Sequence, residues 1–190
     1  MKKKNFLSVC VLTITLIVGT SVFAQKSSKD TKMVGGAAMY PSKNIVENAV
    51  NSKDHTTLVA AVQAADLVET LQSAGPFTVF APVNDAFESL PDGTVANLLK
   101  PENKAALQGV LTYHVIAGKF SAADVVGAIK KSNGTATFET VSGGKLMAKL
   151  MDGKVQLIDE NGRTAFVTIA DVNQSNGVIH VIDTVVLPKM

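Results

Sequence analysis

The sequence contains one cysteine, no tryptophan and three histidines among its 190 residues. The cysteine, Cys10, lies in an N-terminal segment that we expect to be cleaved, so the mature chain has no thiol. Disulfide bonds and nucleophilic cysteine chemistry are therefore excluded, and the stability of the fold has to come from packing.

Motifs that would indicate catalysis are missing as well. The chain has no Walker-type loop, no Gly-x-Ser-x-Gly elbow, no His-Glu-x-x-His and no Gly-x-Gly-x-x-Gly. Its histidines, His55, His114 and His180, include no closely spaced pair that would indicate zinc. His114 and His180 lie in apolar, strand-like sequence typical of core residues. We predict no catalytic residue, no metal and no cofactor; a histidine-dependent hydrolase is the least favoured alternative.

The first 24 residues have the pattern of a secretory signal peptide. Lys2, Lys3 and Lys4 precede an apolar run over residues 6–18, and Ala24 ends a segment suited to cleavage. The signal carries three of the 18 basic residues and none of the 16 acidic ones, so the mature chain is almost neutral. This balance argues against a nucleic-acid partner. We expect a secreted, periplasmic or cell-surface protein with no membrane span in the mature chain.

The segment after the signal shows no clear period of helix or strand. Residues 25–43 are rich in Lys and Ser and then in Gly, Ala and Met, which predicts a flexible leader. A single domain is predicted over residues 44–190.

The first half of this domain is predicted to be rich in helices. Apolar residues recur three or four apart over residues 43–51 after Ser42, from Thr56 to the Gly75-Pro76 stop, and over 94–112 with a break at Pro101. Capping boxes are predicted at Asp85 with Glu88 and at Ser121 with Asp124. Short strands are expected over residues 77–81 and 113–116.

The second half changes to the period of two that is typical of β-strands. The predicted strands cover residues 135–141, 146–150, 154–158, 164–169 and 178–187, and they are separated by Gly-containing turns. A helix-rich half followed by hairpins favours an α+β fold over an alternating βαβ arrangement.

The last predicted strand, residues 178–187, is almost continuously apolar and β-branched. This composition predicts a strand covered on both faces. His180 and Asp183 lie within it, and each needs a hydrogen-bonding partner, because an unsatisfied buried polar group costs about 1–3 kcal/mol.

Three blocks of this sequence resemble the signature of the fasciclin I domain family. They are Gly75-Pro76-Phe77-Thr78-Val79-Phe80-Ala81-Pro82-Val83-Asn84-Asp85-Ala86-Phe87, Tyr113-His114-Val115, and Asn176-Gly177-Val178-Ile179-His180-Val181-Ile182-Asp183. The short signal with its lysines resembles the single-domain secreted bacterial type. The resemblance implies a β-wedge of about seven strands flanked by helices, in which Phe77, Asn84, Asp85, His180 and Asp183 form the structural motif.

The same resemblance implies a role in cell adhesion or matrix association without catalysis. By position, Tyr113-His114 and Asp171-Val172 correspond to the partner-contacting residues proposed in animal members. The expected partner is a cell-surface or matrix protein or a polysaccharide, with loops such as 171–175 and 147–152 supplying contacts.

The alternative function is that of a carrier for an apolar small molecule such as a carotenoid or lipid. Hydrophobic residues make up 46% of the chain, and Met147, Leu150 and Met151 are expected to line an adaptable groove.

Overall fold

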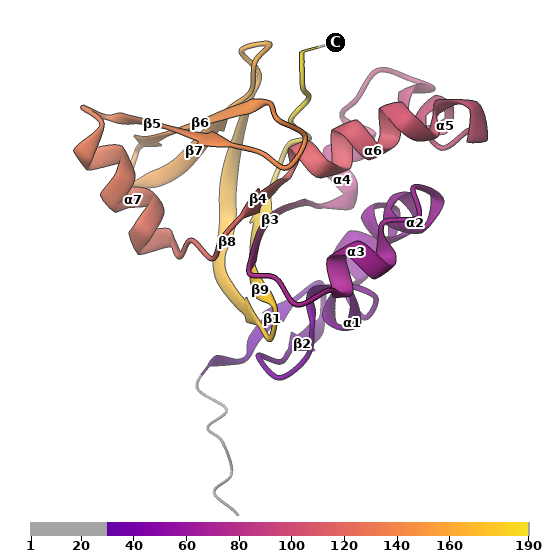
Figure 1. Ribbon diagram of the computed structural model, residues 1–190, viewed down its shortest axis with the longest axis horizontal. Helices are drawn as coiled ribbons and strands as arrows, with labels where there is room; N and C mark the ends of the chain where they lie inside the picture. Colours follow the sequence, from indigo (N-terminus) through magenta and orange to yellow (C-terminus); the bar gives the residue numbers. More distant parts are fainter. Residues whose placement is uncertain (1–29, 190) are drawn as a thin grey trace, which may run out of the picture.

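The computed structural model describes residues 30–189 (Figure 1). The predicted signal peptide, residues 1–24, lies outside the described residues, as do positions 25–29 of the predicted leader. The strands are β1 (Lys32–Val34), β2 (Ala37–Met39), β3 (Phe77–Pro82), β4 (Val115–Ala117), β5 (Thr135–Glu139), β6 (Lys145–Met151), β7 (Lys154–Ile158), β8 (Thr164–Gln174) and β9 (Gly177–Ile182). The helices are α1 (Ile45–Ala49), α2 (Thr56–Ala64), α3 (Val68–Gln72), α4 (Asn84–Glu88), α5 (Thr94–Leu98), α6 (Lys104–Tyr113) and α7 (Ala122–Lys131), with short 3-10 turns at Lys53–His55 and Pro101–Asn103.

Strand β9 is an interior strand of a seven-stranded sheet with the order β4-β3-β9-β8-β7-β6-β5. It runs parallel to β3 and antiparallel to β8, and all six of its residues are buried. The first residue of the strand, Gly177, has to be a glycine, because a Cβ there would lie 2.1 Å from the carbonyl oxygen of Phe77. The predicted last strand is therefore covered on both faces. It ends at Ile182 and not at residue 187, since Val185 and Val186 leave the sheet and pack into separate clusters.

Strand β8 connects two halves of this sheet. Its first residues pair with β7 and the later ones with β9, and the register shifts twice between Val167 and Val172. Such bulges bend a strand and increase its twist. The half made of β5, β6 and β7 consequently projects from the central strands (Figure 1). The predicted α+β architecture with seven strands is confirmed.

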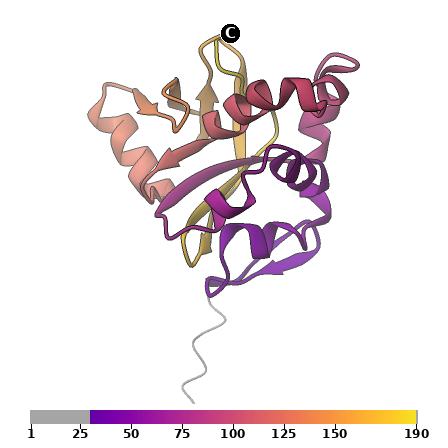
Figure 2. The ribbon, with the colours of Figure 1, turned by 45° about the vertical axis from the view of Figure 1, so that its right-hand side comes forward.

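Alternate residues of the central strands face two different cores. Val79 of β3 and Ile179 and Val181 of β9 pack with residues of α1, α2 and α6. Phe80 and Ile182 belong to a second core with α7 and the inner side of β5 to β8. Figures 1 and 2 show the same division, with α7 beside β5 to β7 and helices α1 to α6 on the other side.

The predicted flexible leader over residues 25–43 is wrong for its described part. Strands β1 and β2 form an antiparallel hairpin, and Val34 and Met39 are each only 1% exposed within the helical core. The periodicity of residues 32–39 does not indicate this hairpin, because each strand has only three residues. In residues 30–189, no helix is both long and apolar enough to cross a bilayer.

Several helix boundaries also differ from the prediction. Asn44, not Ser42, caps α1, in a capping box with Glu47. The helix predicted from Thr56 to Gly75 is divided into α2 and α3, because Asp66 adopts a left-handed backbone conformation with φ of 53°. The predicted break at Pro101 and the capping box of Ser121 with Asp124 are both present.

Candidate functional site

Tyr113 ends helix α6 and is completely buried. Its hydroxyl donates to the carbonyl oxygen of Lys145 at 2.7 Å and accepts the backbone N–H of Glu160 at 3.2 Å. Burial raises the pKa of Tyr113 to about 12, so the hydroxyl remains a donor at physiological pH. The side chain therefore joins α6 to the beginning of β6 and to the turn after β7.

His114 follows Tyr113 and uses both ring nitrogens within the protein. Its Nδ1–H donates to the carbonyl oxygen of Val110 at 2.8 Å, and its Nε2 accepts the backbone N–H of Val186 at 3.3 Å. Burial lowers the pKa of His114 to about 4, which keeps the ring neutral. His114 thus holds the C-terminal segment against α6.

His180 connects β9 to the bulge of β8 and to the segment before α7. Its Nδ1 accepts the backbone N–H of Asp171 at 3.2 Å, and its Nε2–H donates to the carbonyl oxygen of Phe120 at 2.8 Å. The ring stacks on Phe80 with a centroid separation of 5.7 Å. Burial lowers the pKa of His180, so this ring is also neutral.

The predicted partner-contacting residues do not form an exposed surface. Tyr113, His114 and Val172 are at most 3% exposed, which contradicts direct contact between their side chains and a partner in this conformation. Asp171 is half-buried, and its carboxylate accepts the first backbone N–H of α7, that of Ala122, at 2.7 Å. Most of the predicted loop 171–175 is the end of β8.

The groove predicted from Met147, Leu150 and Met151 is not formed. All three residues lie on β6, where neighbouring side chains point to opposite faces. Met147 and Met151 share the outer face of the sheet, whereas Leu150 has the orientation of the buried Leu146 and Ala148. The three side chains therefore cannot line one groove.

In the described part of the chain, no helix packs on the outer face of β5 to β8. Helix α7 covers the opposite face, through Val125 and Ile129. Strand pairing places half-buried Met147, Ile158 and Phe166 near the middle of the outer face. The residues around them are mainly polar, namely Thr135, Thr137, Lys145, Lys149, Gln156 and Thr164.

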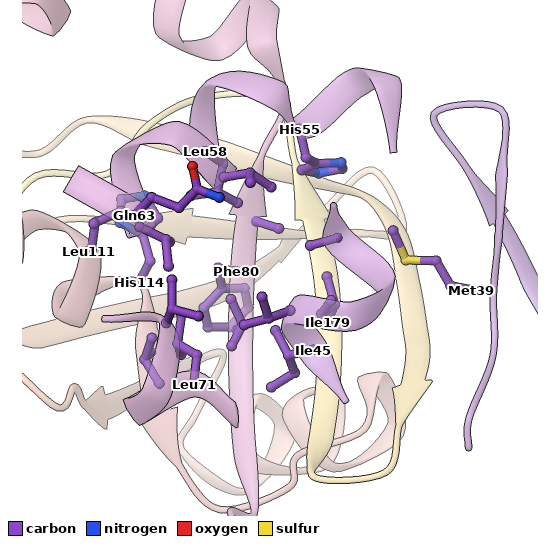
Figure 3. A pocket seen from close by; sticks show the side chains of 18 residues that line it. Met39, Ile45, His55, Leu58, Gln63, Leu71, Phe80, Leu111, His114 and Ile179 are labelled. Carbon is purple, nitrogen blue, oxygen red and sulfur yellow. The ribbon is translucent and has the colours of Figure 1, made fainter. Parts of the chain in front are cut away.

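A separate apolar cavity of about 80 Å³ lies between the central strands and helices α1, α2 and α3 (Figure 3). Its walls are mostly aliphatic, with contributions from Ile45, Leu58, Leu71 and Ile179. His55 lies at one end of α2, and Gln63 lies near the other end (Figure 3). Two of the few polar side chains in the wall are histidines, His55 and His114.

Comparison with known proteins identifies the family. The model of the fasciclin domain matches residues 53–188. The chain belongs to the fasciclin domain family.

Relatives of this fasciclin domain include bacterial proteins of similar length. Protein sll1483 of Synechocystis is 49% identical over 87% of this chain and 84% of its own length. The immunogenic protein MPB70 of Mycobacterium bovis is 30% identical over 99% of both chains. A solved FAS1 domain pair from the insect cell adhesion molecule fasciclin I matches with a TM-score of 0.69 and 17% identity. That match covers 76% of this chain and about half (51%) of the domain pair, and it shows the shared fold.

The other residues of the signature have identifiable positions in this fasciclin domain. Phe77 begins β3 and packs on the helical core. Asn84 accepts the backbone N–H of Thr57 at 3.1 Å and donates to the carbonyl oxygen of Lys53 at 2.8 Å, which ties α4 to the start of α2. Asp85 is exposed and forms no capping box.

Asp183 is exposed, whereas the sequence predicts it to lie within a strand that is covered on both faces. Its carboxylate accepts the backbone N–H of Phe166 at 2.8 Å, while its own N–H donates to the carbonyl oxygen of Phe166 at 3.2 Å. Asp183 therefore fastens the end of β9 to β8. No three His, Cys, Asp or Glu side chains within residues 30–189 gather closely enough to hold a metal ion.

Sequence reasoning missed one connection made by the Asn176-Gly177 turn. The Asn176 side chain accepts the backbone N–H of Ile45 at 3.1 Å and donates to the carbonyl oxygen of Leu71 at 2.8 Å. It thereby joins α1 and α3, the two helices that flank the cavity. The sequence signal for this turn was its Asn-Gly pair, which reports local backbone preference and not these distant partners.

Proposed function

We propose that this protein is an exported, non-enzymatic module that binds a cell-surface or matrix macromolecule, either a protein or a polysaccharide. The observation that carries the proposal is the outer face of β5 to β8, on which no helix packs within residues 30–189. Membership of the fasciclin family and the likeness in fold to a cell adhesion molecule support it. The N-terminal sequence pattern supports export to the periplasm, the cell surface or the medium.

The outer face has the composition of a binding surface. Met147, Ile158 and Phe166 supply apolar area near its middle, and threonines and lysines surround them. Protein interfaces are typically arranged with an apolar centre and a polar rim, and Met and Phe are enriched in the centre. The exposed side chains of Thr135, Thr137 and Lys145 supply hydrogen-bond donors around this centre.

The environments of His114 and His180 support a function without catalysis. A general base needs a nitrogen that can reach the substrate proton. His114 and His180 are buried, and both nitrogens of each ring are occupied by backbone groups. Neither ring is therefore arranged to transfer a proton to a bound molecule.

The test is retention of cells, isolated matrix protein or isolated polysaccharide by the immobilised protein. We expect retention above that on an unrelated secreted protein of similar charge, and the separate arms identify the class of partner. The double variant Met147→Glu with Phe166→Glu should reduce retention at least tenfold. Ala60→Glu, on the exposed side of α2, is the matched control and should leave retention unchanged. Retention that is absent, or equal in the two variants, would refute the proposal.

A further inference from the structure

The large sheet has two edge strands, β4 and β5, and only one of them is protected. β4 has three residues, and the carbonyl oxygen of Val115 accepts the backbone N–H of Val141, just after β5, at 2.8 Å. β5 has five residues, and β6 is the only strand that pairs with it in residues 30–189. It has no proline or lysine, which commonly protect an edge, and its one charge, Glu139, is its last residue. β5 is therefore the unprotected edge of the sheet.

The hydrogen bonds just beyond β5 show which of its backbone groups point away from β6. The N–H of Thr140 donates to the carbonyl oxygen of Gly144, in the turn toward β6, at 2.9 Å. Because hydrogen-bonding direction alternates along a strand, the even-numbered residues of β5 bond to β6 and the odd-numbered ones point outward. The outward bond from Val141 to β4 agrees with this alternation.

Three residues of β5, Thr135, Thr137 and Glu139, consequently direct their backbone groups at the open edge. The N–H of Thr135 donates to the carbonyl oxygen of Ser132 at 3.3 Å, whereas no described residue accepts the N–H of Thr137 or of Glu139. All three residues are exposed. Unpaired N–H and C=O groups along an edge are a template for a further strand.

We propose that β5 pairs antiparallel with β5 of a second copy of this chain, with the two Thr137 residues opposite each other across a two-fold axis. The unpaired groups match in this register. Each Thr137 N–H donates to the Thr137 carbonyl oxygen of the other copy, and each Glu139 N–H donates to the Thr135 carbonyl oxygen. Every unpaired N–H group of β5 thereby gains an acceptor. A register shifted toward Val141 is opposed, because β4 occupies the edge there.

The side chains are complementary in the same register. On the inner face Ala136 lies opposite Phe138 of the second copy, so that a small side chain meets a large one. On the outer face Glu139 lies opposite Thr135, whose neighbour on β6 is Lys149. The carboxylate of one copy therefore lies diagonal to the ammonium group of the other, and no like charges are directly opposed.

This pairing has two consequences for the assembly. Each copy contributes the same edge, so the contact is closed and the assembly stops at a dimer. The two-fold axis is perpendicular to the sheet, so both outer faces lie on one side and form a continuous surface with two copies of Met147 and Phe166. The pairing does not depend on what that surface binds.

Sedimentation equilibrium of the purified protein tests the association. We expect a concentration-dependent equilibrium between monomer and dimer, with no larger species. Thr137→Pro removes the central outward N–H at a position where an edge strand tolerates proline, and it should raise the dimer Kd at least tenfold. Thr137→Val keeps the N–H and the branched side chain, and it should leave the Kd unchanged.

Cross-linking tests the register, and it does so even if Thr137→Pro fails to fold. In a Cys10→Ser background, a short bifunctional thiol reagent should join two copies of Thr137→Cys, because opposite Cα atoms of such a pair are about 5.5 Å apart. Thr135→Cys alone should not react, since its two copies are separated by roughly 13 Å along the strands. A mixture of Thr135→Cys and Glu139→Cys should react, and exposed Thr164→Cys on β8 is the control.

Three results would overturn the proposal. They are a protein that stays monomeric at millimolar concentration, equal dimer Kd values for Thr137→Pro and Thr137→Val, and equal cross-linking of Thr137→Cys and Thr164→Cys. Retention of a matrix macromolecule by a strictly monomeric protein would overturn the dimer while leaving the proposed function in place.

Discussion

Acidification should destabilise the protein through His114. The ring is completely buried, and burial lowers its pKa in the folded state from 6.5 to about 4. The folded state consequently binds fewer protons than the unfolded state between these values. The stabilisation of the folded state that is linked to the lowered pKa of His114 is fully present above pH 6.5 and is lost as the pH falls toward 4.

The size of this effect follows from the pKa difference. Each pKa unit corresponds to about 1.36 kcal/mol, so acidification from pH 7 to 4 should remove about 3 kcal/mol of unfolding free energy through His114. Burial is the main cause of the lowered pKa. In addition, protonation would bring an Nε2–H against the N–H of Val186, which now donates to Nε2. The lowered pKa values of His55 and His180 act in the same direction.

Urea denaturation at a series of pH values from 7 to 4, with constant ionic strength, measures the effect. The variant His114→Gln isolates it, because glutamine keeps hydrogen-bonding atoms but does not titrate. We expect His114→Gln to lose about 1–3 kcal/mol at pH 7. Its unfolding free energy should then depend less on pH than that of the wild type, by about 3 kcal/mol over the range. Parallel pH profiles for the two proteins would refute the reasoning.

Two further predictions test the N-terminal hairpin and the role of Asn84. Met39→Ala should lower the unfolding free energy by about 2–5 kcal/mol because it empties a buried site, whereas Met33→Ala should change it by less than about 0.5 kcal/mol, since Met39 is 1% and Met33 62% exposed. Equal effects in urea denaturation would argue against a packed hairpin. Asn84→Ala should cost about 1–3 kcal/mol because it removes the hydrogen bonds to Thr57 and Lys53. Asp85→Ala should leave the unfolding free energy nearly unchanged. A lower melting temperature for Asp85→Ala than for Asn84→Ala would contradict this account of the two residues.

Local patterns identified those features whose causes lie within a few residues. Ser121 and Asp124 form a capping box because the two side chains and the helix start are adjacent in sequence. Asp152-Gly153 turns between β6 and β7 because both residues adopt a positive φ, of 51° and 77°. The signature blocks identified the family for a similar reason, since they record the residues that start, pair and end the central strands.

Features that depend on distant partners were predicted poorly. By position Tyr113 and His114 correspond to partner-contacting residues proposed in animal members, whereas the apolar sequence around His114 is typical of a core residue. The turn after β7 and the C-terminal segment bury both side chains. The cavity beside His55 exists because Asn176 and β9, more than 100 residues away in sequence, position α1 and α3. No local pattern encodes such contacts.

The sequence by itself determined the family, the α+β architecture and the burial of β9, because apolar period and turn chemistry are local properties of the chain. Only the tertiary structure decided which polar groups are enclosed, that residues 32–39 belong to the folded domain, and that an apolar cavity lies between the central strands and helices α1 to α3. These properties arise when segments far apart in sequence exclude water from one another, and that exclusion is a property of the assembled fold.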